Sequence, residues 1–294
     1  MLEHESHRPA EPSPAARWRN RGPGMGLLVV GHGTADPVGA DETRALASRL
    51  AELLPGVPVE LGFLEVIGPS IDEACGRLAA RGCTAAVAAP LLLFTAGHAR
   101  RDVPEALVAA AVAHRIAIAQ SAAIGCHPRV VELARRRRMA ALGMHPPDES
   151  GGTALVVIGR GSSAADAVDQ LRAFVAATLD AESAASMPVE LGFVAAARPT
   201  VEEALARAAD RGPRRIVVQP HLLFRGHVED QVAEAVSRAR AAHPAIDWVV
   251  VPRLGADPLV AEAVLERATA ALGGEFAVPE STIWAGKNLS QEAS

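Results

Sequence analysis

Aromatic residues are scarce in this chain, and tyrosine is absent. Its 294 residues include six Phe and three Trp, although 49% of the residues are hydrophobic. The interior must therefore be built mainly from Ala, Val, Leu and Ile, which suits helices packed on a parallel sheet. A chain of this length forms either one large domain or two of ordinary size.

Cysteine is also rare. Cys75, Cys83 and Cys126 are an odd number of thiols, and none of them forms a C-x-x-C pair. This pattern argues against a disulfide framework, a zinc knuckle and an iron–sulfur cluster. We expect reduced thiols in a cytoplasmic protein.

The chain has no excess of positive charge and no long apolar run. Its formal net charge is −5, whereas nucleic-acid-binding proteins usually carry a basic face, so we expect no nucleic-acid partner. The one dense basic run, at residues 134–141, is interpreted as the solvated end of a helix, where the helix dipole favours cations. No stretch approaches the roughly 20 apolar residues of a membrane span, so no membrane partner is expected either.

Both ends of the chain lack a clear pattern. Residues 1–24 are polar and Pro-rich without the apolar segment of a signal peptide, and we predict a disordered extension there. The ordered pattern begins directly after Met25, which could itself be the start of the protein. Residues 274–294 are predicted to be a loose tail.

An internal duplication organises the rest of the chain. The hexapeptide PVELGF occurs at residues 58–63 and again at 188–193. Four further pairs of segments match at nearly the same offset: 29–34 with 157–162, 68–74 with 198–204, 90–98 with 220–227, and 125–132 with 255–262. Such self-similarity indicates a repeated unit of roughly 120 residues.

Within each unit, short aliphatic runs alternate with helical patterns, which predicts a mainly parallel sheet flanked by helices. We therefore predict an α/β fold of two similar lobes, at residues 25–145 and 146–273, joined by a Pro- and Gly-rich hinge at 143–153. Strands are expected near residues 26–31, 58–66, 84–93 and 115–120, and near 153–159, 188–195, 214–223 and 246–252. Helices are expected near residues 40–54, 69–81, 100–112 and 128–142, and after each strand of the second unit.

Three side chains of the first unit are candidates for chemistry. His32 follows the first strand, Glu65 ends the second strand, and His98 follows the third. The carboxyl ends of parallel strands share one edge of the sheet, which is where such folds bind ligands. Two imidazoles and a carboxylate suit a divalent transition ion and leave coordination positions open. The same groups could instead act as bases.

A structural interpretation of these residues competes with the functional one. A single histidine after a strand more often forms a structural hydrogen bond, and Glu65 alone could pair with a surface arginine. Convergence at one edge, with Gly31, Gly33 and Gly97 beside the imidazoles, favours the functional interpretation. Glycine at these positions permits tight turns and the close approach of a bulky ligand.

The second unit departs from the first at two of these three positions. Arg160 stands in place of His32, and Ala195 in place of Glu65. A metal site that has lost two of three ligands is not expected to persist, so the second lobe is predicted to keep the fold without the chemistry. Arg160 offers a planar cation suited to a carboxylate or a phosphate.

Two histidines of the second unit have no assigned role. His227 is the counterpart of His98, and His221 stands where the first unit has Leu91. The sequence does not decide between structure and function for either of them.

The chain resembles the sirohydrochlorin chelatases, the cobalt- or iron-inserting enzymes of cobalamin and sirohaem synthesis. The resemblance is carried by LLVVGHGT at 27–34, GFLEVIGPSIDEA at 62–74 and PLLLFTAGHARRDVPEAL at 90–107. It continues more weakly through the second unit and so covers about residues 25–273. The His-rich metal-storage tract and the Cys-rich cluster of some members are missing here.

The resemblance implies a lyase with two α/β lobes that hold a tetrapyrrole in the cleft between them. It assigns metal binding and catalysis to His32 and His98, with the acidic residue matching Glu65. A divalent metal ion, either Co²⁺ or Fe²⁺, is the second substrate, and no organic cofactor is needed. Co²⁺ is favoured because the long, fused form resembles cobalamin-pathway members, although Ni²⁺ also suits these ligands.

The carboxylates of sirohydrochlorin would require cationic partners. Arg100, Arg101, Arg160 and Arg225 are the candidates for binding them, although each could equally be an ordinary surface arginine. Asp102 is expected to cap the helix that begins there. Because one chain supplies both lobes, we expect a monomer.

Three other functions remain compatible with the residues. A non-catalytic metal or tetrapyrrole carrier would use the same ligands. A phosphatase with a phosphorylated histidine is less well matched, because the residue before His32 is a glycine instead of an arginine. A two-lobed module that only binds a small molecule is the third.

Overall fold

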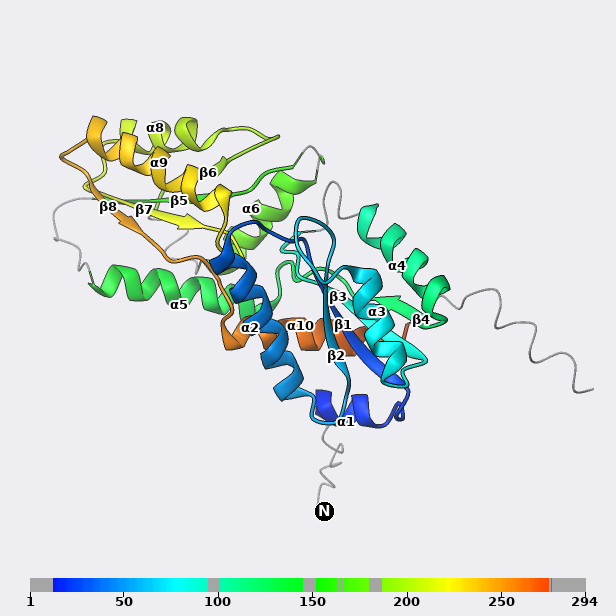
Figure 1. The fold of residues 1–294 in the computed structure, drawn as a ribbon. Coiled ribbons are helices and arrows are strands. Elements are labelled where there is room, and N and C mark those ends of the chain that lie inside the picture. The colour runs from blue at the N-terminus through cyan, green and yellow to red at the C-terminus, as the bar shows by residue number, and fades with distance from the viewer. Residues whose placement is uncertain are drawn as a thin grey trace, which may run out of the picture.

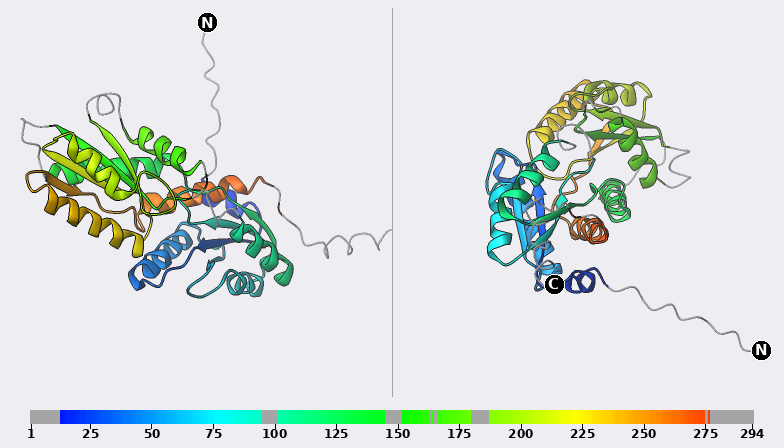
Figure 2. Two further views of the ribbon diagram at one scale, coloured as in Figure 1. Left: turned by 90° about the horizontal axis from the view of Figure 1, so that it is seen from above. Right: turned by 90° about the vertical axis from the view of Figure 1, so that its right-hand side faces the viewer.

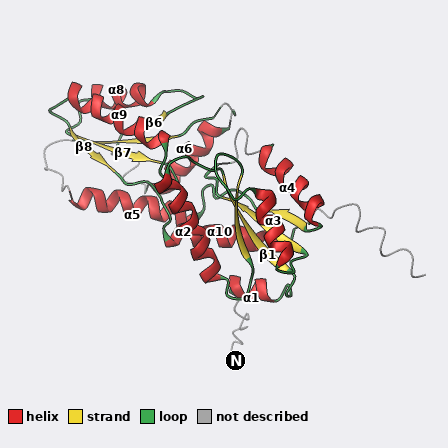
Figure 3. Ribbon diagram, in the orientation of Figure 1, coloured by secondary structure: helices red, strands yellow, loops and turns green. Residues whose placement is uncertain are grey.

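Two lobes, each a four-stranded parallel sheet with helices on both faces, make up the molecule (Figure 1; Figure 3). The strand order is β2-β1-β3-β4 in the first sheet and β6-β5-β7-β8 in the second. The predicted α/β fold of two similar lobes is confirmed. The computed structural model describes residues 13–94, 101–144, 152–162, 164, 166–179, 187–274 and 276.

The elements alternate as the repeat predicts. The first repeat contains β1 (Met25–Gly31), α2 (Pro37–Leu53), β2 (Val59–Phe63), α3 (Ile71–Ala80), β3 (Ala85–Pro90), α4 (Asp102–His114), β4 (Ala117–Gln120) and α5 (Pro128–Met144). The second contains β5 (Thr153–Gly159), α6 (Ala167–Thr178), β6 (Val189–Phe193), α8 (Val201–Asp210), β7 (Arg215–Pro220), α9 (His227–Ala242), β8 (Asp247–Val250) and α10 (Pro258–Ala271). Within the described residues, no helix is long and apolar enough to cross a bilayer.

Matching helix starts explain one of the repeated motifs. In α3 the Ser70 side chain accepts from the Glu73 N–H, and the Glu73 carboxylate accepts from the Ser70 N–H. Thr200 and Glu203 form the same capping box at α8. Two otherwise unpaired backbone donors are satisfied in each helix, so both repeats begin this helix at the same place.

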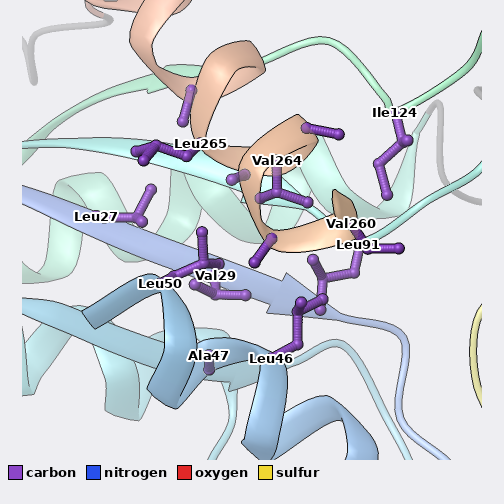
Figure 4. Packing of buried hydrophobic residues seen from close by; sticks show 14 of the residues in the cluster. Leu27, Val29, Leu46, Ala47, Leu50, Leu91, Ile124, Val260, Val264 and Leu265 are labelled. Atoms are coloured by element: carbon purple, nitrogen blue, oxygen red, sulfur yellow. The ribbon is translucent and has the colours of Figure 1, made fainter. Parts of the chain in front are cut away.

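The last helix of each repeat packs on the sheet of the other repeat. Helix α10 covers the face of the first sheet that carries Leu27 and Val29, and α2 packs on the same face (Figure 4). Helix α5 packs beside α6, and its Ala141 joins the core under β5. The two exchanged helices lie side by side between the lobes (Figure 2). The predicted boundaries at 25–145 and 146–273 therefore follow the repeats, whereas the packing units exchange α5 and α10.

A short helix precedes the first strand, where disorder was predicted. Helix α1 (Pro14–Arg19) buries Trp18 completely, and its indole N–H donates to Thr269 Oγ1 at 2.9 Å. The prediction for residues 1–24 is therefore wrong for 13–24, because the indole gains both an apolar surface and a hydrogen-bond acceptor on α10. At the other end, Phe276 packs against the same core although it falls in the predicted loose tail.

The basic run in α5 is only partly solvated. Successive helical residues are about 100° apart, so four consecutive arginines point to all sides of a helix. Arg136 is exposed and pairs with Glu132 on the same helix. Arg138 is buried, and its guanidinium donates to Gln219 Oε1 at 3.0 Å and to the carbonyl of Thr178 at 2.6 Å. The prediction of a solvated helix end is thus wrong for Arg138, which binds α5 to the second lobe.

Candidate functional site

His32 lies at the C-terminal end of β1, an inner strand of the first sheet. All of β1 is buried, and the strand pairs with β2 on one side and β3 on the other. The Leu64 N–H donates to the carbonyl of Gly31 at 2.9 Å, and the Glu65 N–H donates to the carbonyl of His32 at 3.1 Å. The loop after β2 therefore lies directly against the His32 turn.

This backbone pairing brings the predicted imidazole and carboxylate together. His32 Nε2 lies 3.3 Å from Glu65 Oε1, and the two side chains are 37% and 58% exposed. The pair therefore faces solvent at the edge of the sheet where parallel-sheet proteins bind ligands. A neutral imidazole can bind a metal ion or take up a proton, and the carboxylate can orient the ring or share either task.

Gly33 is required by the turn itself. Its φ is +101°, and a Cβ on this residue would lie 1.9 Å from the carbonyl oxygen of Glu65. No side chain fits between the two backbones. The glycine therefore permits a close approach of the chain to itself, whereas the sequence suggested the close approach of a ligand.

The third predicted member, His98, lies outside the described residues, as does Arg100. Arg101 is described and exposed, and it stands at the N-cap of α4 without a side-chain cap hydrogen bond. Asp102 is the first helical residue instead of the cap. Within the described residues, no group of three or more His, Cys, Asp or Glu is arranged to hold a metal ion.

The second lobe repeats the turn with other side chains. The Ala195 N–H donates to the carbonyl of Arg160 at 2.9 Å, and a Cβ on Gly161 would lie 1.8 Å from the carbonyl oxygen of Ala195. Arg160 itself is exposed at the end of β5. Its guanidinium has no hydrogen bond or ion pair with the part of the chain that the structure describes, so it is available to an anion.

Arg225 is placed differently from the expectation for a substrate-binding residue. Its Nη2 lies 2.6 Å from Asp230 Oδ1, and its guanidinium is within 3.8 Å of carboxylate oxygens of Glu229 and Asp36. A substrate carboxylate would have to compete with these three groups. The geometry favours a role between the lobes, because Asp36 belongs to the first lobe.

His221 and His227 have unlike surroundings. His227 is the exposed first residue of α9. His221 is buried between Phe94 of the first lobe and Phe174 of α6, with ring centroids 5.0 Å and 4.0 Å away. Among the described residues its Nε2 has no hydrogen-bond partner, and burial lowers the pKa of His221 to about 3, so the imidazole is neutral at physiological pH.

The sequence analysis missed a pair of charged residues beside the His32 turn. Glu42 of α2 and Arg253, in the loop after β8, form an ion pair of 2.5 Å between the lobes. A signal was present in the repeat, because their counterparts in the other unit are the uncharged Gln170 and Ala123. The duplication thus offers two equivalent positions for such a pair between the lobes, and only the position beside the His32 turn is charged.

Comparisons with known proteins agree with each other. The family model described as CbiX matches the chain twice, at residues 26–141 and 154–271. The chain is 28% identical over 251 residues to the sirohydrochlorin cobaltochelatase of Priestia megaterium, which covers 85% of this chain and 80% of that protein. It is 30% identical over 243 residues to the sirohydrochlorin ferrochelatase of Bacillus subtilis (strain 168), which covers 82% of this chain and 89% of that protein.

Solved structures show the same likeness. SirB from Bacillus subtilis with Fe³⁺ superimposes with a TM-score of 0.73 at 28% identity, covering 86% of this chain and 99% of that one. The sirohydrochlorin chelatase SirB from Bacillus subtilis subspecies spizizenii in complex with cobalt gives a TM-score of 0.67 at 25% identity, covering 84% and 94%.

Proposed function

Since this chain belongs to the CbiX family, the sirohydrochlorin chelatases in their long two-lobe form, we propose that it inserts a divalent metal ion into sirohydrochlorin. The observation that carries the proposal is the contact of 3.3 Å between His32 Nε2 and Glu65 Oε1 at the open edge of the first sheet. The second lobe has neither side chain, so the chemistry belongs to the first lobe alone.

The reaction exchanges one metal ion for two protons. The ion leaves its waters and binds the pyrrole nitrogens, and two pyrrole N–H groups release their protons. His32 and His98 hold the incoming ion and take up protons, and the Glu65 carboxylate assists His32. The metal ion is a substrate in this scheme, and no organic cofactor takes part.

The second lobe would bind the carboxylates of the macrocycle. Arg160 is suited to this task because its exposed guanidinium, at the sheet edge matching that of His32, has no acidic partner in the described part of the chain. Arg100 and Arg101, which follow His98 in sequence, would contribute from the first lobe. One chain supplies both sides of this arrangement, so we propose a monomer.

Co²⁺ is the favoured metal, and Fe²⁺ is the alternative. Relatives of similar identity are named for each metal, so similarity does not separate them. Imidazole and carboxylate ligands accept both ions, and their affinities alone do not select one. The choice also decides between a place in cobalamin synthesis and one in sirohaem synthesis.

An anaerobic absorption assay tests the proposal. Purified protein is mixed with sirohydrochlorin and Co²⁺, Fe²⁺ or Ni²⁺, and the shift of the absorption bands is followed against the spontaneous reaction. We expect acceleration by the wild type, its loss in His32→Ala and in His98→Ala, and retention of most activity in His227→Ala. A protein that never exceeds the spontaneous rate is not a chelatase.

The same assay separates the alternative functions. A non-catalytic carrier would bind the metal ion or the macrocycle without increasing the rate of insertion. A histidine phosphatase would hydrolyse a generic phosphomonoester, which we expect this protein not to do.

A further inference from the structure

Six charged side chains meet between the lobes, beside the His32 turn. We call this group the lobe clamp; its members are Asp36, Glu42, Arg225, Glu229, Asp230 and Arg253. Asp36 and Glu42 belong to the start of α2 in the first lobe, and the other four belong to the second lobe. The clamp therefore joins the two lobes only four residues after His32 in the chain.

Glu42 is the centre of the clamp. Its carboxylate accepts from Arg253 Nη2 at 2.5 Å, from Arg253 Nε at 3.2 Å and from the backbone N–H of Arg225 at 2.8 Å. Arg253 also donates to both oxygens of Glu229 at 2.9 Å. The side chains of Glu42, Arg253 and Glu229 are only 21%, 21% and 23% exposed. Solvent therefore screens the two ion pairs of Arg253 less than it screens a surface ion pair.

Asp36 links the clamp to the His32 turn. One of its oxygens caps α2 by accepting from the N–H groups of Val38 and Gly39 at 2.9 and 3.2 Å. The other oxygen faces Arg225 Nε at 3.8 Å. The cap therefore fixes both the start of α2 and the end of the turn that carries His32.

The backbones of the two lobes touch at the same place. A Cβ on Gly39 would lie 2.0 Å from the carbonyl oxygen of Arg225, so α2 needs glycine there to dock on the second lobe. In the second repeat the matching residue is Ala167, and the matches of Glu42 and Arg253 are Gln170 and Ala123. The equivalent contact on the side of the Arg160 turn therefore lacks the charges of the Glu42–Arg253 pair.

Two helix ends offset part of the excess negative charge of the clamp. Four carboxylates face two guanidinium groups, but α2 and α9 both begin here and present the positive ends of their dipoles. Asp36 caps α2, and Glu229 and Asp230 lie in the first turn of α9. Each of the four carboxylates thus has a cationic side chain or a helix N-terminus as its partner, which argues for a structural linkage between the lobes.

We infer that Glu42 and Arg253 are positioning residues, which hold the His32 turn against the second lobe at the spacing that metal insertion requires. The inference rests on the proposed function, because it concerns the approach of a first-lobe metal ion to a macrocycle held partly by the second lobe. Errors of about 1 Å in such an approach can cost a hundredfold in rate. In this scheme the clamp acts through the His32 turn and not by binding either substrate.

Kinetics of clamp variants give the first test. Glu42→Gln keeps the size of the side chain, Arg253→Met keeps its apolar stem, and each variant removes a charge. We expect kcat of Co²⁺ insertion to fall at least tenfold in each variant, while the Kd for Co²⁺ measured without the macrocycle stays within twofold. The double variant should lose no more than either single variant. The matched control is Glu202→Gln with Arg238→Met, an exposed ion pair within the second lobe, which should leave kcat unchanged.

Hydrogen exchange gives a second test that does not depend on activity. We expect amides of residues 36–43 and 224–227 to exchange at least tenfold faster in Glu42→Gln than in the wild type, and the control variants to match the wild type. Unchanged exchange would show that no clamp exists. Faster exchange with an unchanged kcat would show a clamp that positions nothing, and either result overturns the inference. A wild type that inserts no metal would instead refute the proposed function, and the exchange data would still decide whether the lobes are held here.

Discussion

The His32 turn and the Arg160 turn share the same backbone structure but carry different side chains. In each, the residue after a buried strand accepts a hydrogen bond from the N–H of the residue that matches Glu65, at 3.1 Å in the first lobe and 2.9 Å in the second. In each, a glycine has a positive φ, and a Cβ on that glycine would lie less than 2 Å from the carbonyl oxygen of the same residue. Only the side chains differ, His32 and Glu65 in one and Arg160 and Ala195 in the other.

The difference separates the residues that the fold of the turn requires from those that the proposed chemistry requires. Strand, glycine and backbone hydrogen bonds persist in both copies because the sheet edge cannot close without them. The second copy closes the same edge with an arginine and an alanine, so the closure does not require the imidazole and the carboxylate. Four sets of substitutions test this comparison of the two lobes.

Replacing His32 by the residue of the other lobe should have the largest effect. We expect His32→Arg to lower kcat/KM of metal insertion at least a hundredfold, in the range typical of losing a group that transfers protons or binds the metal. Circular dichroism should show an unchanged fold. The reciprocal change, Arg160→His, should create no second centre, because Ala195 supplies no carboxylate. Activity within tenfold of the wild type in His32→Arg would remove His32 from the chemistry.

Substitution of the turn glycines should act equally on the two lobes. Gly33→Ala and Gly161→Ala each force a Cβ into a backbone carbonyl at 1.9 and 1.8 Å, so we expect each to lower the free energy of unfolding by about 3 kcal/mol or more. Urea unfolding measures this loss. Gly82→Ala is the control, because its φ is +80° with nothing within 4 Å, and it should cost only about 1–2 kcal/mol of backbone strain. A large loss from Gly33→Ala alone would mean that the two turns are not equivalent.

Replacing His221 by its first-lobe counterpart should flatten the pH dependence of stability. Burial lowers the pKa of His221 from 6.5 to about 3. Between these two pH values the imidazole is protonated in the unfolded chain and neutral in the native state. As the pH falls below about 6.5, the free energy of unfolding of the wild type should therefore decrease, relative to that of His221→Leu, by up to about 1.4 kcal/mol per pH unit. Urea unfolding from pH 7 to pH 4.5 measures the difference. The exposed His227→Leu should behave as the wild type, and parallel curves for His221→Leu would contradict the burial of a neutral imidazole.

Removing the arginine of the second turn should have the smallest effect. We expect Arg160→Ala to raise the KM for sirohydrochlorin about five- to tenfold, which corresponds to about 1–1.4 kcal/mol of binding. The kcat and the affinity for Co²⁺ should not change, since the proposed metal ligands are in the other lobe. Arg211→Ala is a fitting control, because Arg211 pairs with Glu190 at the start of β6. An unchanged KM would assign the carboxylates of the macrocycle to other residues.

The sequence was sufficient to predict the helices and strands and the pairing of His32 with Glu65. Every predicted strand is present, and the strands differ mainly at their ends: β2 stops at Phe63, and residues 64–66 form the loop against His32. His32 and Glu65 meet because adjacent parallel strands end at one edge, a rule that needs no coordinates. The positions of His98 and Arg100 lie outside the described residues and stay predictions.

Other side chains could not be placed from their local sequence. From the sequence, Arg138 is expected to be one of four solvated arginines, but the helix directs it toward Gln219 of the second lobe. Trp18 stands in a polar, Pro-rich segment and becomes buried only because α10 arrives from the far end of the chain. A periodic pattern indicates which residues face inward, but it does not indicate which distant element they meet.

The sequence by itself determined the duplication, the order of strands and helices, the glycines of both turns and the lobe that carries the imidazole and the carboxylate. These depend on hydrogen bonds and periodicities within short segments, or on comparing one repeat with the other. The tertiary structure alone decided that α5 and α10 each pack on the other repeat and that Glu42 contacts Arg253. It also decided that His221 lies between Phe94 and Phe174 with no hydrogen bond to its Nε2 from the described residues. Glu42 and Arg253 are 211 positions apart in the sequence, and only packing of the whole chain brings their charged atoms to 2.5 Å from each other.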